Sequence, residues 1–282
     1  AISKDLLILF RKIYKRYKNV ITMETELIKP IVKVGNSAGV VLPKEWYGGK
    51  ARIKLIETAP NIKKDILEIL DSYLDNVLGI YIVGSYARGQ QKEHSDVDIL
   101  VITSDINKKI NKGKYEILMI SKKNVENALK NNILPILPML KESKAILNKN
   151  LILEYAKTPL TKGNLRLHFE TTKSAMKMNE SSISLSKEIG EDCGYDVIYS
   201  LILRLREVYI VDCLIKDELW GTNEFVRLIK KISGSADVYA SYMDVKRNKN
   251  SKEVLSANIA EKIRIYILER IKEQEKWLIK KE

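Results

Sequence analysis

Two carboxylates, Asp96 and Asp98, stand two residues apart where the apolar run 99–102 begins. On a strand, this spacing places both side chains on the same face. Neighbouring carboxylates repel each other unless a cation lies between them. Oxygen ligands with no cysteine nearby favour Mg²⁺ or Mn²⁺. The pair therefore predicts a divalent metal site at the end of a strand.

A glycine turn, Gly84-Ser85, interrupts the short apolar run 80–83 upstream of this pair. Glycine permits a backbone turn that other residues resist, and it lets a ligand approach closely. A helix that begins near the serine would direct its free N–H groups at a phosphate above the turn. The stretch 79–102 thus predicts a strand, a tight turn, a short helix, a loop and a second strand.

The two patterns together, GSxxxG at 84–89 followed by SDxD at 95–98, resemble the nucleotidyltransferase signature of the DNA polymerase β superfamily. The spacing is similar to that of the minimal and kanamycin nucleotidyltransferase branch, over about residues 61–121. The resemblance implies transfer of a nucleoside monophosphate from an NTP to an acceptor hydroxyl, with release of pyrophosphate. In that chemistry the two aspartates would hold Mg²⁺ or Mn²⁺, and the glycine turn would hold the triphosphate.

The resemblance also implies a third carboxylate on a neighbouring strand. Glu116 is the only acid in the strand-like run 115–120, whereas the runner-up, Asp105, lies in a predicted loop. The third carboxylate would bind the metal near the acceptor hydroxyl or help to deprotonate it. Arg88 would neutralise phosphate charge or be solvated, and Ser95 would orient the loop before the aspartates. The expected catalytic and metal-binding set is Asp96, Asp98 and Glu116, and the expected nucleotide-binding set is Gly84, Ser85, Arg88 and Ser95.

Upstream, the string KVGNSAGVVLPKEW resembles the AbrB/MazE family of swapped-hairpin barrels. Strands are expected at 27–34, 40–42 and 51–57, with a helical turn at 43–46. The resemblance implies a homodimer of interleaved hairpins and, in many members, DNA binding. A small β unit that serves dimerisation alone is the alternative. The candidate nucleic-acid-binding residues are Lys33, Lys44, Lys50, Arg52 and Lys54.

The charge of the chain is uneven. The 282 residues carry a formal net charge of +13. Residues 1–60 hold 12 lysines and arginines against 5 acidic residues, which is about half of that excess. Such a segment favours polyanions and predicts DNA or RNA as a partner of the N-terminal region. The first 22 residues form a basic amphipathic pattern that fits a targeting or membrane-surface helix, or an arm that packs on a partner or a nucleic acid.

Other features bear on location and on the second half of the chain. No apolar run is long enough for a transmembrane helix, and two cysteines without metal-binding spacing fit a reduced, cytoplasmic setting. Helical spacing predicts one helix over 62–77, while 104–114 is expected to be a loop and 122–160 to be short helices and linkers. The segment 164–282 is expected to be helical.

This C-terminal half resembles, by architecture alone, the helical half of kanamycin-type enzymes and the HEPN bundles that partner minimal nucleotidyltransferases. HEPN ribonucleases use an arginine followed by a histidine a few residues on. Arg204 and Arg206 are present, but no histidine follows His168. A nuclease is therefore disfavoured, and a bundle for packing and substrate positioning is expected.

The fold predicted is a multidomain α+β chain with a small swapped-hairpin β module, an αβ nucleotidyltransferase core with a short mixed sheet, and a helical bundle. The expected parts are 1–22, 23–59, 60–122 with a linker to 160, and 161–282. The expected function is metal-dependent nucleotidyl transfer. One alternative is a DNA-binding regulator or antitoxin-like protein with an inactive nucleotidyltransferase scaffold. Another is an enzyme of the antibiotic-modifying type. The acceptor and the preferred base of the NTP are left open.

Overall fold

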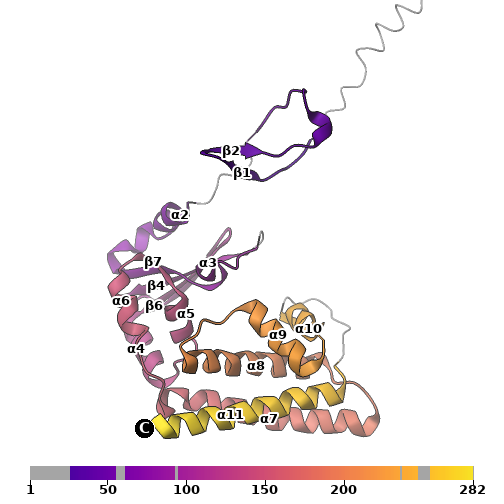
Figure 1. Cartoon of the computed structure of the whole chain (residues 1–282). Coiled ribbons are helices and arrows are strands. Elements are labelled where there is room, and N and C mark those ends of the chain that lie inside the picture. The colour runs from indigo at the N-terminus through magenta and orange to yellow at the C-terminus, as the bar shows by residue number, and fades with distance from the viewer. Residues whose placement is uncertain (1–25, 55–60, 93–94, 236, 247–254, 282) are drawn as a thin grey trace, which may run out of the picture. The chain divides into compact units, whose positions relative to one another are not determined.

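The computed structural model of the chain describes residues 26–54, 61–92, 95–235, 237–246 and 255–281 (Figure 1). Its internal contacts divide the chain into two units, Ala1–Ala59 and Pro60–Glu282. The basic amphipathic segment expected at 1–22 lies outside the described residues.

In the first unit, β1 (Ile31–Val34) pairs antiparallel with β2 (Ser37–Val40), and the short 3-10 helix η1 (Lys44–Trp46) follows. The strand expected at 51–57 is not formed by residues 51–54, and the rest of it lies outside the described residues. No residue among 26–54 is buried. Val41 and Tyr47, for example, are 68% and 96% exposed. These described residues therefore build no hydrophobic core of their own.

The second unit contains a mixed five-stranded sheet in the order β5-β6-β4-β3-β7. The central strand β4 runs parallel to β6 and antiparallel to β3, and the other pairs are antiparallel. The predicted α+β class is confirmed. The strands are β3 (Val77–Ile82), β4 (Val97–Thr103), β5 (Lys108–Lys112), β6 (Tyr115–Ser121) and β7 (Lys144–Leu147).

Both edge strands correct the sequence analysis. β5 lies inside the expected loop 104–114, and β7 lies inside the expected run of helices and linkers, 122–160. Edge strands are short and one-sided, so they lack the apolar run that marks a central strand. In β5 only Ile110 is partly buried, and the polar residues on either side of it are exposed. The reason for its strand conformation is its antiparallel pairing with β6, which composition does not reveal.

The helix expected over 62–77 is also shorter than predicted. α2 (Ile62–Ile69) begins after Asn61, whose side chain accepts a hydrogen bond from the Lys64 N–H, and a 3-10 helix, η2 (Asp71–Asn76), follows it. Asn76 donates through its side chain to Ser104 and Asp105, and its carbonyl accepts from the Ser104 N–H. These bonds hold Asn76 beside the end of β4, at the point where the chain enters β3.

The sheet is covered on both faces. Ile80, Ile99 and Val101 pack with α2, whereas their neighbours Tyr81, Leu100 and Ile102 belong to the core that continues into the helical half. Because successive strand residues point to opposite faces, each strand supplies both cores. The helices that follow the sheet strands are α3 (Gly84–Arg88), α4 (Lys122–Asn131), α5 (Leu137–Glu142) and α6 (Lys149–Tyr155).

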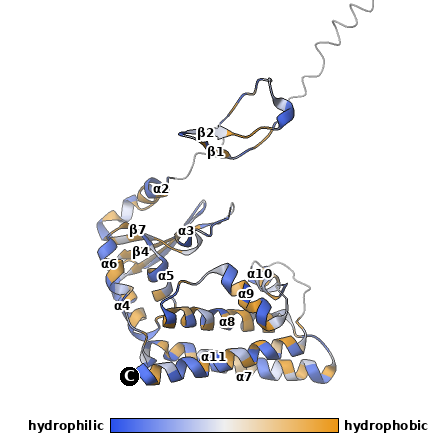
Figure 2. Cartoon of the chain, in the orientation of Figure 1, coloured by the Kyte–Doolittle hydropathy of each residue, from blue (hydrophilic) through white to orange (hydrophobic). Residues whose placement is uncertain are grey.

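The C-terminal half is helical, as expected. The helices α7, α8 and α11 lie side by side and pack on one another, and α9 and α10 pack along the same group (Figure 1). Hydrophobic and hydrophilic residues alternate along the long helices, which is typical of helices with one buried stripe (Figure 2). The helices are α7 (Lys162–Ile189), α8 (Tyr195–Lys216), α9 (Thr222–Ser233), α10 (Asp237–Lys246) and α11 (Ala257–Lys281).

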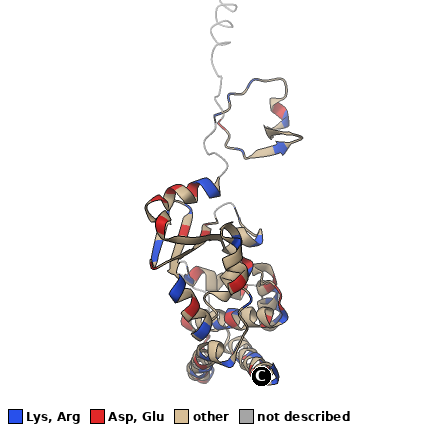
Figure 3. Ribbon diagram, turned by 90° about the vertical axis from the view of Figure 1, so that its left-hand side faces the viewer, with Lys and Arg blue, Asp and Glu red and all other residues tan. Residues whose placement is uncertain are grey.

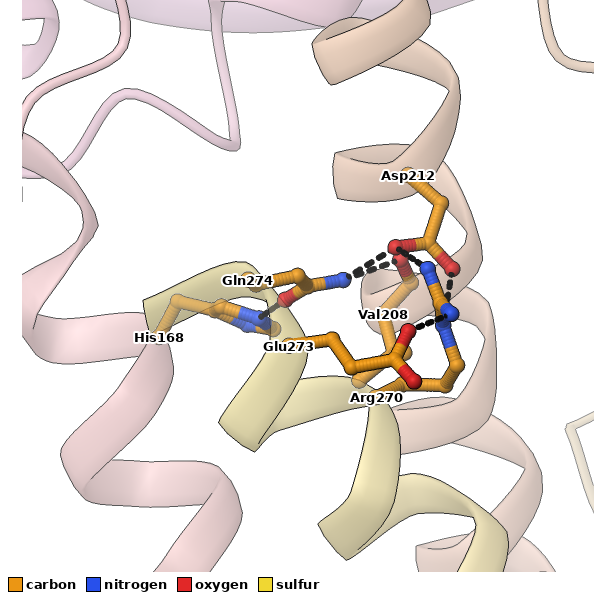
Figure 4. A network of polar contacts seen from close by, with 6 residues as sticks. All are labelled: His168, Val208, Asp212, Arg270, Glu273 and Gln274. Carbon is orange, nitrogen blue, oxygen red and sulfur yellow. Dashed lines mark hydrogen bonds and ion pairs between the residues drawn. The ribbon is translucent and has the colours of Figure 1, made fainter. Parts of the chain in front are cut away.

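A polar network joins the three long helices (Figure 4). Arg270 of α11 donates two hydrogen bonds of 2.9 Å to the Asp212 carboxylate of α8. Gln274 donates to Asp212 at 2.8 Å and to the carbonyl of Val208 at 2.9 Å. The side-chain oxygen of Gln274 lies 3.3 Å from Nε2 of His168 on α7. Such a network fixes the register of the helices, because a shift would leave buried polar groups unpaired.

Candidate active site

The glycine turn is built as its sequence predicts. β3 ends at Ile82, and α3 begins at Gly84 and ends before Gly89, which adopts the left-handed conformation. Gly84 itself has φ +68°. A Cβ atom added to Gly84 would lie 2.2 Å from Oδ2 of Asp98. The turn thus requires glycine twice, for its backbone conformation and for the close approach of the carboxylate.

The register of the sheet brings the second and third predicted carboxylates together. Asp98 of β4 lies directly opposite Glu116 of β6, on adjacent parallel strands. Both are partly buried, and both alternate with buried apolar residues along their strands. Asp96 is exposed and precedes β4, so only one aspartate of the pair lies within the strand itself.

The site concentrates negative charge around Asp98. Burial raises the pKa of the Asp98 carboxyl, and the nearby charges of Glu116, Asp96 and Glu142 raise it further, while Arg88 lowers it. Asp98 therefore interacts electrostatically with both of its predicted partners, which is a direct sign that the three carboxylates share one region.

The donor set suits a hard divalent cation, because all three predicted ligands are carboxylates and Asp98 already experiences their repulsion. The side chains do not yet converge. Glu116 forms an ion pair of 3.0 Å with Lys109 of β5. In the part of the chain that the structure describes, no three acidic, histidine or cysteine side chains surround a common point. The three carboxylates fit Mg²⁺ or Mn²⁺ by their chemistry, and the strand register places Asp98 beside Glu116.

A residue that the sequence analysis missed lies at the centre of this region. Glu142, the last residue of α5, accepts a hydrogen bond of 2.6 Å from the Gly84 N–H. Its second oxygen forms an ion pair with Arg88, whose expected partner was phosphate or water. No local pattern could have identified Glu142, because it ends a short, mostly apolar helix and lies 54 residues from Arg88 in the chain.

The two predicted serines occupy different positions. Ser85 is partly buried within α3, and its carbonyl accepts from the Gln90 N–H at 2.9 Å. The Ser95 hydroxyl accepts a hydrogen bond of 2.8 Å from the Lys92 N–H, and the Ser95 N–H donates to the carbonyl of Lys92. Ser95 therefore fixes the loop that leads into Asp96 and β4.

The helical half reaches the same turn. The Gln90 side chain accepts from the Thr222 N–H, at the start of α9, with a distance of 3.4 Å. Lys141, the neighbour of Glu142 in α5, forms an ion pair with Asp217 at the end of α8. The segment between α8 and α9 thus contacts Gln90, which follows α3, and Lys141 of α5. Sequence analysis placed Asp217 and Thr222 in a bundle expected to serve packing and substrate positioning, and it named neither of them as a site residue.

The five basic residues named for nucleic-acid binding are all exposed. They lie on or near the hairpin and η1 (Figure 3). Exposure does not distinguish these five residues from the other residues of the unit, because every described side chain of this unit is at least partly exposed. Their part in nucleic-acid binding stays a prediction.

Comparison with known proteins identifies the sheet-containing region. Residues 63–155 match the family model described as a nucleotidyltransferase domain. A curated Methanocaldococcus jannaschii protein, provisionally named a protein adenylyltransferase, is 43% identical over 54 residues, which are 19% of this chain and 52% of that protein. The chain therefore spans about half the length of this relative.

Two solved structures are similar over a larger part of the chain. A nucleotidyltransferase-like protein from Exiguobacterium sibiricum is 16% identical with a TM-score of 0.39, over 78% of each chain. The spectinomycin adenyltransferase of Enterococcus faecialis, solved with ATP and spectinomycin, is 16% identical with a TM-score of 0.40, over 76% of this chain and all of that one. Among the described residues, no helix has the length and apolar character needed to cross a bilayer.

Proposed function

We propose that the chain transfers a nucleoside monophosphate from an NTP to an acceptor hydroxyl. The observation that carries this proposal is the position of Asp98, which lies between the glycine turn on one side and Glu116 on the other. A nucleotide-binding turn, a metal-binding carboxylate and a third acid are the three parts that such a reaction requires. The family match of residues 63–155 supports the same reaction.

In the proposed reaction the acceptor oxygen attacks the α-phosphorus of the NTP. The bond between the α-phosphorus and its bridging oxygen breaks, and pyrophosphate leaves with the electron pair. Asp96 and Asp98 would hold Mg²⁺ or Mn²⁺, with Glu116 as the third ligand. The ion would polarise the phosphate and offset the charge on the leaving group. Glu116 is also the candidate to accept the proton of the hydroxyl, because its side chain is 42% exposed and lies directly opposite Asp98.

The turn residues have a separate role in this proposal. Ser85 would contact the triphosphate through its N–H and hydroxyl, and Gly84 lets the nucleotide approach the backbone. Ser95 would hold the loop of Asp96 in place, through its bonds to Lys92. Arg88 would contribute positive charge beneath the phosphates, although part of that charge is already offset by Glu142.

The test is a transfer assay with the four radiolabelled NTPs, Mg²⁺ or Mn²⁺, and a mixture of tRNA, short DNA and protein from a cell extract. ATP is the first nucleotide to examine, because the named relative is an adenylyltransferase. The variant with Asp96→Ala and Asp98→Ala runs beside the natural chain. Label that moves to one class of acceptor, and only with both aspartates present, supports the proposal and names the acceptor. Label transfer that survives the double substitution contradicts it.

A second candidate function concerns the hairpin unit. Its described residues bury no side chain, so the unit needs another surface to complete a fold. We propose that a second copy of the chain supplies this surface and that its basic residues then contact DNA or RNA. Salt-sensitive DNA binding without any nucleotide transfer would favour a DNA-binding regulator whose nucleotidyltransferase core serves as a scaffold.

A further inference from the structure

One carboxylate contacts both ends of the short helix that carries the glycine turn. The two oxygens of Glu142 are bound to the Gly84 N–H and to the Arg88 guanidinium. The Glu142 side chain is 5% exposed and that of Arg88 is 13% exposed. Hydrogen bonds to a charged group are stronger and more directional than neutral ones, so this contact restrains the residues that it joins.

We infer that Glu142 is a positioning residue, which fixes the glycine turn against Asp98 for the transfer reaction. The inference rests on the proposed function and adds a residue to it. Gly84 passes so close to Asp98 that there is no room for even a Cβ atom between them. A shift of the turn therefore changes the space between the nucleotide and a metal-binding carboxylate. A misplacement of about 1 Å in such a site can cost about 100-fold in rate.

The element that carries Glu142 is rigid enough for this role. In α5, Leu137 and Leu140 are only 1% and 2% exposed and belong to the core shared by the sheet and the bundle. Groups held by packed helices keep a geometry more precisely than groups on loops. The neighbouring Lys141 ties the same helix to Asp217, at the end of α8.

Another role is conceivable for a carboxylate at this place, namely as an anion that occupies the phosphate site until the nucleotide displaces it. The burial of Glu142 argues against this role. A triphosphate must enter from the open side of the turn, whereas the Glu142 side chain is nearly inaccessible to solvent. The two roles predict different kinetic effects of removing Glu142, which the experiment below separates: a lower kcat if Glu142 positions the turn, and a lower KM for the nucleotide if it occupies the phosphate site.

The experiment compares Glu142→Ala and Glu142→Gln with the natural full-length chain. Glu126→Ala is the matched control, because Glu126 is also a helical carboxylate that accepts a hydrogen bond from another element, the hydroxyl of Tyr155. Three quantities are measured: kcat and KM of nucleotide transfer, the thermal midpoint, and the NMR shift and exchange rate of the Gly84 amide proton. Labelled glycine makes that amide visible.

We expect Glu142→Ala to lower kcat by about 10- to 100-fold at a temperature where the variant is folded. We expect Glu142→Gln to lose less, because its amide oxygen still accepts from Gly84. The Gly84 amide proton shifts upfield and exchanges faster in Glu142→Ala. Glu126→Ala should change kcat, KM and the exchange rate of the Gly84 amide proton by no more than about twofold.

Two results would overturn the inference while leaving the proposed function intact. One is an unchanged kcat in folded Glu142→Ala, which would make Glu142 a stabilising residue only. The other is a lower KM for the nucleotide at unchanged kcat, which would identify Glu142 as an occupant of the phosphate site. If the natural chain transfers nothing, the proposed function fails. In that case the NMR signal of the Gly84 amide proton still tests whether Glu142 places the turn. A changed signal in Glu142→Ala upholds this placement, and an unchanged signal overturns it.

Discussion

Asp98 and Glu116 lie directly opposite each other on the adjacent parallel strands β4 and β6. Like charges in this position repel, and the repulsion lowers the stability of the folded chain. We expect Asp98→Asn to raise the thermal midpoint in EDTA, because it removes one of the opposed charges. The same variant should lower nucleotide transfer by at least about 100-fold, because it removes a proposed metal ligand.

The matched control for this pair is Asp105→Asn. Asp105 is the other acid considered as the third carboxylate, and it binds Asn76 at the far end of β4. The variant Asp105→Asn should leave the rate of nucleotide transfer within about twofold of the natural rate, whereas Glu116→Gln should lower that rate strongly. The reverse order of effects would transfer the third role from Glu116 to Asp105.

Two glycines of the same motif allow the steric requirement to be separated from the backbone requirement. Gly84 and Gly89 have φ +68° and +70°. An alanine at 89 would meet nothing within 4 Å, whereas an alanine at 84 would collide with the Asp98 carboxylate. We expect Gly89→Ala to cost about 1 kcal/mol of unfolding free energy and to keep transfer. Gly84→Ala should cost more and abolish transfer, as measured by urea unfolding and label transfer. Equal effects of both substitutions would contradict this steric account.

The bundle contains a carboxylate with a pH-dependent contribution to stability. Burial tends to raise the pKa of Glu207, but the His168 ring, whose Nδ1 lies 3.9 Å from the carboxylate, and the hydrogen bond from Arg204 outweigh it and hold the pKa below its ordinary 4.5. The unfolded chain therefore binds more protons here than the folded chain does. The stabilisation is present above pH 4.5 and is lost as the pH falls through the lowered pKa.

We expect Glu207→Gln to reduce the unfolding free energy at pH 7 and to have a smaller effect at an acidic pH below 4.5, because the contribution of the charged carboxylate is lost as the pH falls through the lowered pKa. Urea unfolding of both chains at the two pH values measures this difference. An effect of Glu207→Gln that is the same at both pH values would mean that the charge of Glu207 contributes nothing.

The polar network of the bundle provides a prediction with an internal control, because Arg270 contacts two carboxylates (Figure 4). Asp212 is 14% exposed and also binds Gln274, whereas Glu273 is 60% exposed. We expect Asp212→Ala to cost about 2–4 kcal/mol of unfolding free energy, because it leaves the partly buried Arg270 guanidinium with only the exposed Glu273 and removes one of the two acceptors of the buried Gln274 amide. Glu273→Ala should cost less than about 0.5 kcal/mol. Similar losses in the two variants would contradict the importance of burial here.

The hairpin unit predicts association. Its described apolar side chains are exposed, and Val41 is 68% exposed. If a second copy covers them, sedimentation of the full-length chain should show a dimer that weakens with dilution. Val41→Asp should shift it toward the monomer, and Lys50→Glu, at an exposed charged position, should not. A natural chain that is monomeric at all concentrations would contradict this self-association and would mean that another partner covers the apolar side chains of the unit.

The sequence by itself determined the strand, glycine turn and short helix of 79–102 and the identity of its carboxylates. It could do so because these features depend on residues a few positions apart: a glycine for a positive φ, an apolar run for a buried strand, and two acids at strand spacing. The matching of residues 63–155 to a nucleotidyltransferase domain agrees with this local pattern.

Only the tertiary structure decided which distant residues meet at the turn. Glu142 reaches Gly84 across 58 residues, and Gln90 reaches Thr222 across 132. The edge strands β5 and β7 likewise owe their conformation to pairing with a neighbour. Such contacts depend on strand register and on how helices pack against the sheet. No local pattern encodes these contacts, because many other acids and polar runs in the sequence have the same local character.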